Sequence, residues 1–252
     1  MSASSTLLPI GPPLFAAIVL ATLIAAALAA LARMGHGAAV LRAGARAVVQ
    51  LGAVSLIITA VVTSGPLTLL YVAVMLGVAG FTAGRRFTTR RCAVLAVVPI
   101  AVAVVPFLGV LLAAGLVRTV GLVLIPISGI LIGGGLTATS LAGRRAMDEL
   151  AARKGEVEAA LSLGMSPRDA ALEICRPAAV SALIPALDQT RTVGLVTLPG
   201  AFVGMLMGGA SPVDAGAVQL FVLTGLLLVE VIAIVGCLEM FARGVFPPRE
   251  AR

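Results

Sequence analysis

The sequence predicts an all-α, polytopic membrane protein with about seven transmembrane helices. Of its 252 residues, 60% are hydrophobic and only 12% are charged, and the mean hydropathy is +1.14. A soluble domain carries about 25% charged residues, so this chain has too few polar side chains to cover a surface that faces water. Its apolar residues also form runs long enough to cross a bilayer, which excludes a soluble globular protein and a disordered one.

Seven stretches have the roughly 20 mainly apolar residues that a transmembrane helix needs. Gly65 and Pro66 separate the second stretch from the third, and a polar, glycine-rich run before Pro212 separates the sixth from the seventh. We therefore expect spans at residues 13–32, 38–62, 66–84, 92–117, 120–142, 191–209 and 213–241.

The net charge of +7 predicts the orientation of these spans. With seven spans, 17 of the 18 Lys and Arg residues fall on one side of the membrane, and Arg118 alone falls on the other. Cytoplasmic loops carry the excess of basic residues, which predicts an outside N-terminus and a cytoplasmic C-terminus in a plasma (inner) membrane protein. This distribution accounts for the charge without a nucleic acid partner. The odd number of cysteines, three, favours neither a disulfide framework nor a zinc site.

The one sizeable polar stretch, residues 144–180, is predicted to be a cytoplasmic loop within a single transmembrane permease domain that covers residues 1–252. A helix is expected to end at Gly164, because glycine commonly terminates helices. Ser166 is a good N-cap and Pro167 fits the first helical position, so a second helix is expected from there until near Pro177.

The spacing in this loop is E-A-A, three residues, G, nine residues, I, two residues, P. It resembles the EAA loop of ABC transporter permeases, although Arg176 stands where that pattern usually has Leu. The resemblance implies that the loop docks on a separate cytoplasmic ABC ATPase subunit; an ordinary amphipathic surface helix is the alternative. The residues expected to couple to the ATPase are Glu158, Ala159, Ala160, Gly164, Ser166, Pro167, Ile174 and Pro177.

No G-x-x-x-x-G-K-[ST] motif for nucleotide phosphates occurs in the sequence, whose single lysine, Lys154, precedes a glycine. We therefore expect no cofactor on this chain, and we expect ATP and Mg²⁺ on the partner ATPase. The chain itself is predicted not to be an enzyme.

Three further segments resemble the FetB/YbbM iron-export permease family, which also includes the plant aluminium-tolerance permeases. They are residues 125–142, residues 184–204, and Arg46 with Gln50 and Leu51. The resemblance covers roughly residues 36–240. It implies a homodimeric permease in the lipid bilayer, a FetA-like ATPase subunit, and export of iron from the cytoplasm.

Polar groups inside the predicted spans are candidates for the translocation path. Glu230 lies near the middle of the last span, where an ionisable group is costly and usually functional or paired. Arg46 and Gln50 share a helix face, although the arginine has the alternative of snorkelling to the surface. Met205 and Met207 offer thioethers to a soft cation or simply fill space, and the metal-binding residues stay unknown. The candidates are Arg46, Gln50, Ser128, Asp188, Gln189, Arg191, Met205, Met207 and Glu230.

Small residues recur every four positions in the predicted fifth and sixth spans. Such spacing lets membrane helices approach closely, within the chain or in a dimer; a hinge for alternating access beside Pro199 is the other interpretation. The residues concerned are Gly129, Gly133, Pro199, Gly200, Gly204 and Gly208.

Three other functions compete with export. An ABC importer for a metal or another small solute has the same EAA loop, whereas the segment 188–204 favours the exporter family. An intramembrane serine protease needs Ser128 next to a base, and the single histidine, His36, is expected at the opposite side of the membrane. A scaffold without cargo needs no ATPase partner.

Overall fold

The computed structural model describes residues 11–116 and 121–246, and all of the regular structure in these ranges is helical. An isolated bridge between Val193 and Thr197 is the one strand-like feature there, so the predicted all-α class is confirmed. The helices are α1 (Pro12–Leu31), α2 (Gly37–Thr63), α3 (Gly65–Gly84), η1 (Cys92–Ala96), α4 (Val97–Ala113), α5 (Gly121–Ala152), α6 (Lys154–Ser162), α7 (Pro167–Ala179), η2 (Val180–Leu183), α8 (Ile184–Thr192), α9 (Gly200–Met207) and α10 (Pro212–Ala242).

Seven helical segments of the described chain are long and apolar enough to cross a membrane, which confirms the predicted number. Six of them lie close to the predicted spans, although α5 continues ten residues beyond the predicted end at residue 142. The sixth was predicted wrongly at 191–209. The crossing segment is Pro167–Thr192, in which α7, η2 and α8 follow one another without a loop.

The chemistry of the two segments explains this error. Residues 191–209 are apolar in composition, but a turn with Gly194 at φ +81° breaks them and α9 is only eight residues long. The segment 167–192 begins with charged residues, which lower its average hydropathy although one of its faces is apolar. That face, which includes Ala170, Ile174 and Ala179, is buried in the bundle. The helix also runs through Pro177 rather than ending there.

The corrected sixth span changes the side of the membrane predicted for one basic residue, Arg191. Asp188 and Arg191 lie in the last turns of α8, at the far end of this segment from Arg168. Arg191 therefore joins the end predicted to face outside, and Arg118, the one charge predicted there, lies outside the described residues. The other basic residues of the described loops keep their predicted assignment, and the orientation of the termini stays a prediction.

The chain divides into two compact units, residues 1–60 and 61–252. In the first unit, α1 and the start of α2 approach through small residues. A Cβ added at Gly37 would lie 2.9 Å from the carbonyl oxygen of Ala26, and one added at Gly44 would lie 2.9 Å from Thr22 Cγ2. The contact at Gly37 is with backbone and therefore needs glycine, whereas the contact at Gly44 is with a side-chain methyl that can shift. Both helices otherwise expose large aliphatic side chains.

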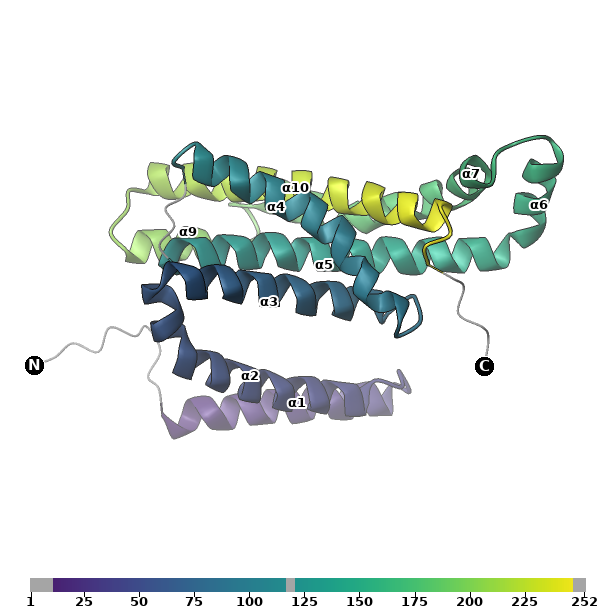
Figure 1. Ribbon diagram of the computed structural model, residues 1–252. Coiled ribbons are helices and arrows are strands. Elements are labelled where there is room, and N and C mark those ends of the chain that lie inside the picture. The colour runs from purple at the N-terminus through teal and green to yellow at the C-terminus, as the bar shows by residue number, and fades with distance from the viewer. Residues whose placement is uncertain (1–10, 117–120, 247–252) are drawn as a thin grey trace, which may run out of the picture. The chain divides into compact units, whose positions relative to one another are not determined.

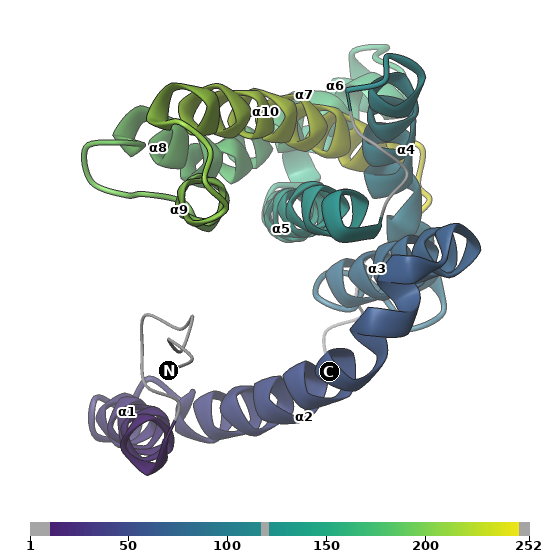
Figure 2. The same cartoon turned by 90° about the vertical axis from the view of Figure 1, so that its left-hand side faces the viewer.

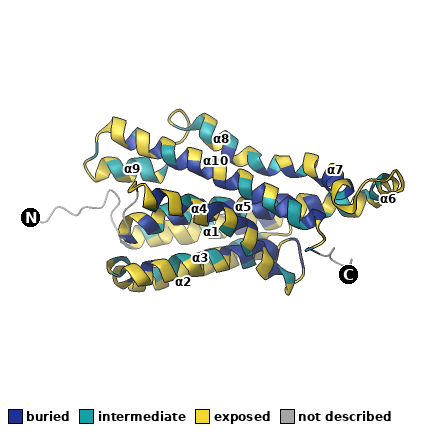
Figure 3. Ribbon diagram, turned by 45° about the horizontal axis from the view of Figure 1, so that its top comes forward, coloured by how far each residue is buried: buried dark blue, intermediate teal, exposed yellow. Residues whose placement is uncertain are grey.

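In the second unit, α10 and α5 form the centre and pack along each other, with α3, α4 and α7 around them (Figures 1 and 2). The buried residues follow these two helices (Figure 3). At one end, Phe87 packs against Phe241 and Phe246, with ring centroids 5.4 and 5.1 Å away. Gly143 makes room for this cluster, because a Cβ there would lie 2.5 Å from Phe87 Cδ1.

The glycines that bring the helices of this unit together are not those predicted for packing. A Cβ added at Gly133, Gly200 or Gly204 would meet nothing within 4 Å, and one at Gly129 would meet only the end of Met75. Gly208, which follows α9, would meet only carbonyl oxygens of that helix. The predicted packing glycines therefore do not bring helices of the second unit into close contact; a role in a dimer contact or a hinge stays a prediction.

Candidate functional site

The site is built at the end of the second unit where α5 leaves the bundle, α6 follows and the chain returns as α7. At the first bend, Arg153 Nε donates to Glu156 Oε1 at 2.7 Å, and its Nη1 lies 3.7 Å from Glu149 Oε2. The hydrogen bond from Arg153 lowers the pKa of Glu156 below its ordinary value. These three side chains hold the last turn of α5 to the first turn of α6.

The helix α6 and the turn after it are open to solvent. None of its residues is buried, and Leu163, just beyond its end, is 86% exposed. Gly164 has φ +89°, a left-handed conformation that side chains other than glycine adopt at a cost. The Glu158 carboxylate has no hydrogen-bond or ion-pair partner among the described residues, so its charge is available to another molecule.

The start of α7 is fixed by the predicted cap. Ser166 Oγ accepts a hydrogen bond from the Asp169 backbone N–H at 3.1 Å and donates to Asp169 Oδ2 at 2.7 Å. Pro167 occupies the first helical turn, as predicted. The same cap recurs at α10, where Ser211 and Asp214 bond in the same way. Because the cap satisfies one of the free N–H groups of the first turn, it favours the start of α7 at this position.

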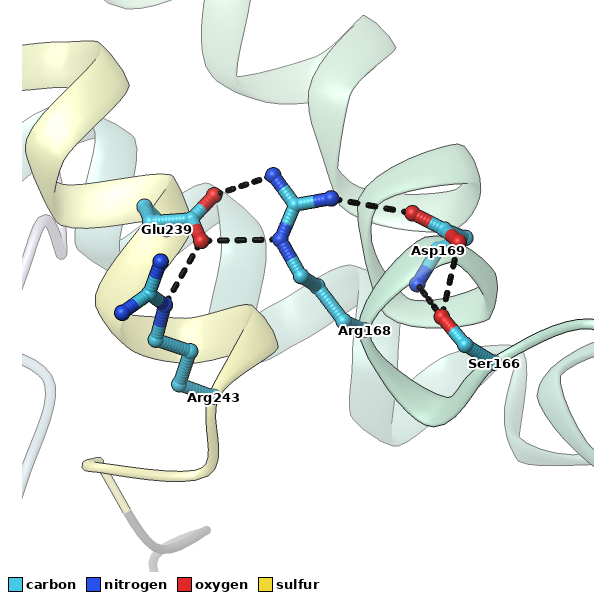
Figure 4. A network of polar contacts seen from close by, with 5 residues as sticks. All are labelled: Ser166, Arg168, Asp169, Glu239 and Arg243. Carbon is cyan, nitrogen blue, oxygen red and sulfur yellow. Dashed lines mark hydrogen bonds and ion pairs between the residues drawn. The ribbon is translucent and has the colours of Figure 1, made fainter.

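A network of charged residues then ties α7 to the end of α10 (Figure 4). Arg168 Nε donates to Glu239 Oε1 at 2.8 Å and Arg168 Nη2 donates to Glu239 Oε2 at 2.7 Å. Arg243 Nε donates to the same carboxylate at 2.7 Å, and Arg168 Nη1 donates to Asp169 at 3.0 Å. The network therefore connects the start of α7, next to the α6–α7 turn, with the last turn of α10.

Sequence reasoning missed this network. From the sequence alone, Glu239 is expected to be a surface acid and Arg168 to be a basic residue of the cytoplasmic loop. Seventy-one residues separate the two, and no local spacing rule connects positions so far apart. Ile174, predicted to couple to the ATPase, is 5% exposed on the side of α7 that packs in the bundle, so it anchors α7 and offers little surface to a partner.

The candidate path residues divide between the two units, and those of the second unit lie at separate places along its helices. Arg46 and Gln50 are exposed on α2. Asp188 and Arg191 form the predicted ion pair at 3.7 Å, both mainly exposed, at the end of α8. Three further candidates lie near this end, where Gln189 and Met207 are exposed and Met205 is half-buried.

Glu230 is the one candidate acid inside the bundle, on α10 and 7% exposed. It faces α5 at Gly134, where an added Cβ would lie 2.8 Å from Glu230 Oε1. Ser128, also on α5, is fully buried, and its Oγ has no hydrogen-bond partner among the described residues. The Glu230 carboxylate therefore lies at the α5–α10 interface, whereas Ser128 is a buried hydroxyl earlier along α5.

A second buried polar group of α10 went unnoticed in the sequence. Gln219 is 5% exposed, its Oε1 has no partner among the described residues, and it lines a cavity of about 200 Å³ beside the turn 193–199. A glutamine among the apolar residues of a span is the signal that identifies it. Among the described residues, no three His, Cys, Asp or Glu side chains lie close enough to hold a metal ion together.

The fold and its apolar spans define the class: a multi-pass helical membrane protein. Residues 13–246 match the model of the family described as an uncharacterised protein family, UPF0014. The chain belongs to this family.

Relatives extend the match. The UPF0014 membrane protein STAR2 of Oryza sativa subsp. japonica is 32% identical over 235 residues, covering 90% of this chain and 82% of STAR2. Protein ALUMINUM SENSITIVE 3 of Arabidopsis thaliana is 43% identical over 88 residues, 35% of this chain and 32% of that protein. The protein named "Probable iron export permease protein FetB" in Escherichia coli (strain K12) is 38% identical over 80 residues, 32% of this chain and 29% of FetB. No solved structure matches. The predicted resemblance to iron-export and plant aluminium-tolerance permeases is confirmed.

Proposed function

We propose that this chain is the membrane-spanning permease subunit of an ATP-driven ABC transporter that exports iron from the cytoplasm. The observation that carries the proposal is the exposed α6–α7 turn, which is joined to α10 through Arg168 and Glu239. This turn includes Leu163 and follows Glu158, whose carboxylate has no partner in the described part of the chain. An exposed, apolar and acidic tip on a rigid connection suits docking on a partner that moves.

In this proposal the ATPase is a separate, FetA-like cytoplasmic subunit, which binds ATP and Mg²⁺. Docking places α6 and the charged ends of α3, α5 and α10 in the cytoplasm, with the N-terminus outside, in the plasma (inner) membrane. Two copies of the chain form the permease. Their aliphatic surfaces, such as those of α1 and α2, face lipid or each other.

Movement of the α6–α7 turn is transmitted to α10, which carries Glu230. This carboxylate lies against Gly134, so a small rotation of α10 relative to α5 changes its surroundings. A carboxylate suits a hard cation, and a single carboxylate without a closed ligand set holds such an ion weakly enough for release. Iron is the proposed cargo because FetB carries that name.

The test is transport in inside-out vesicles that contain the chain and its ATPase. ATP-dependent accumulation of iron inside such vesicles is expected for an exporter. ATP-dependent release of preloaded iron would identify an importer instead, and the absence of any ATP-dependent movement of iron would contradict the proposed cargo. Vesicles with the ATPase alone are the control.

A further inference from the structure

A groove runs along the surface of the second unit between the α7–η2 segment and α10. Its volume is about 340 Å³. Leu172, Ile234 and Leu238 are buried and form its floor, whereas Val231 and Val235 are exposed at its rim. The groove is therefore aliphatic over most of its length.

The α7 side of the groove carries two arginines. Arg168 meets Glu239 at the end of the groove nearest the α6–α7 turn, and Arg176 lies eight residues further along α7, which is about 12 Å along that helix. Arg168 is paired with Glu239 and Asp169, but Arg176 is exposed and has no hydrogen bond or ion pair with any described residue. With Arg243 on Glu239, three arginines face two carboxylates, and Arg176 supplies the excess charge.

The position of the groove along the bundle matches the edge of a bilayer. Val231 and Glu239 are eight residues apart on α10, so the groove extends about 12 Å along that helix. The Arg168–Glu239 pair lies toward the α6–α7 turn, whereas Arg176 and the aliphatic residues after it lie deeper in the candidate spans. A long arginine side chain at such a depth reaches back to the membrane interface, where basic pockets between helices bind anionic head groups.

We propose that this groove binds one anionic phospholipid from the leaflet on the α6–α7 side. The phosphate of the head group accepts hydrogen bonds from the Arg176 guanidinium, whose planar donors suit phosphate oxygens. The first part of an acyl chain lies along Val231 and Val235. A protein partner fits less well, because the rim lacks the aromatic side chains that anchor most protein interfaces.

The experiment is native mass spectrometry of the purified full chain with equal amounts of phosphatidylglycerol and phosphatidylcholine that carry the same acyl chains. The wild type should retain phosphatidylglycerol about fivefold better. Both lipids offer the same phosphate to Arg176, but the choline cation of phosphatidylcholine cancels the net negative charge that attracts an arginine. Arg176→Gln should remove the preference, and Arg176→Lys should keep part of it. Arg90→Gln, which removes an exposed arginine from the α3–η1 loop outside the groove, should change nothing.

A second variant tests the aliphatic part of the groove separately from the charge of Arg176. Val235→Trp fills the aliphatic part and leaves Arg176 in place, so it should also lower retention of phosphatidylglycerol. Equal retention of the two lipids by the wild type, or an unchanged preference in Arg176→Gln, would overturn the proposal. A wild-type dimer that Val235→Trp dissociates, with lipid retention unchanged, would assign the groove to a second copy of the chain and overturn it as well.

Discussion

Arg168, the second residue of α7, donates two hydrogen bonds to the carboxylate of Glu239, which lies in the last turn of α10 and 71 residues further along the chain. This contact joins the exposed α6–α7 turn to the helix that carries Glu230. It gives the proposed coupling a physical route.

Breaking the contact should uncouple the turn from α10. In Arg168→Gln, the side chain loses its charge and one of its two donors to Glu239, so we expect permease-dependent ATPase activity to fall several-fold while membrane insertion stays normal. The double variant Arg168→Glu with Glu239→Arg restores opposite charges across the contact and should recover part of the activity. Activities of co-reconstituted subunits measure this, and full activity in Arg168→Gln would show that the contact carries no coupling.

The turn itself depends on the conformation of Gly164. At φ +89°, alanine costs about 1–2 kcal/mol and proline cannot adopt the angle at all. Gly164→Pro should therefore abolish co-purification of the ATPase, whereas Gly164→Asn should retain it, because asparagine tolerates left-handed angles. If the proline variant binds the ATPase normally, the turn is not the docking element.

The packing of α5 can be tested with two glycines on the same helix. Gly143→Leu forces a side chain into Phe87 and should lower the free energy of unfolding by about 1–3 kcal/mol. Gly133→Leu adds the same side chain where a Cβ meets nothing within 4 Å, and should leave the unfolding midpoint in detergent nearly unchanged. Equal destabilisation of the two variants would contradict the helix register described above.

Glu230 tests the proposed path. Glu230→Gln keeps the shape of the side chain but removes its charge, so we expect iron transport in vesicles to fall more than tenfold with normal expression and ATPase binding. Glu173→Gln neutralises an exposed acid on α7 and serves as the control. Wild-type transport by the Glu230 variant would exclude this carboxylate from the path.

The α5–α6 bend should respond to pH. The hydrogen bond from Arg153 lowers the pKa of Glu156 in the folded chain, so its stabilising contribution is present above the ordinary carboxyl pKa and is lost as the pH falls through the lowered value. NMR titration of the ¹³C-labelled glutamate carboxyls should show Glu156 titrating below its ordinary range, and Arg153→Gln should return it there. The same titration midpoint in both proteins would contradict the contact.

The sequence predicts the helical class, the number of spans and the Ser166 cap because these depend on composition and local spacing. It misplaces the sixth span because the charges of Arg168, Asp169 and Arg176 lower the apparent hydropathy of a segment whose other face is buried. The turn at Gly194 and Pro199 is a visible breaker in the segment chosen instead.

Local sequence patterns carry no information on contacts between segments that are distant in the chain. Gly143 against Phe87 and Arg168 against Glu239 both follow from how the helices pack. Helix packing also decides that Gly134 rather than Gly133 faces Glu230, although the two glycines are adjacent and chemically identical.

The docking claim has its most direct test in a pair of exposed leucines. Leu163 follows α6 and is 86% exposed, and Leu195 lies in the turn after α8 and is 91% exposed. A photo-crosslinking residue placed at each position in turn, in membranes that contain both subunits, should give an adduct with the ATPase from position 163 and none from position 195. An adduct from position 195, or none from position 163, would contradict the account.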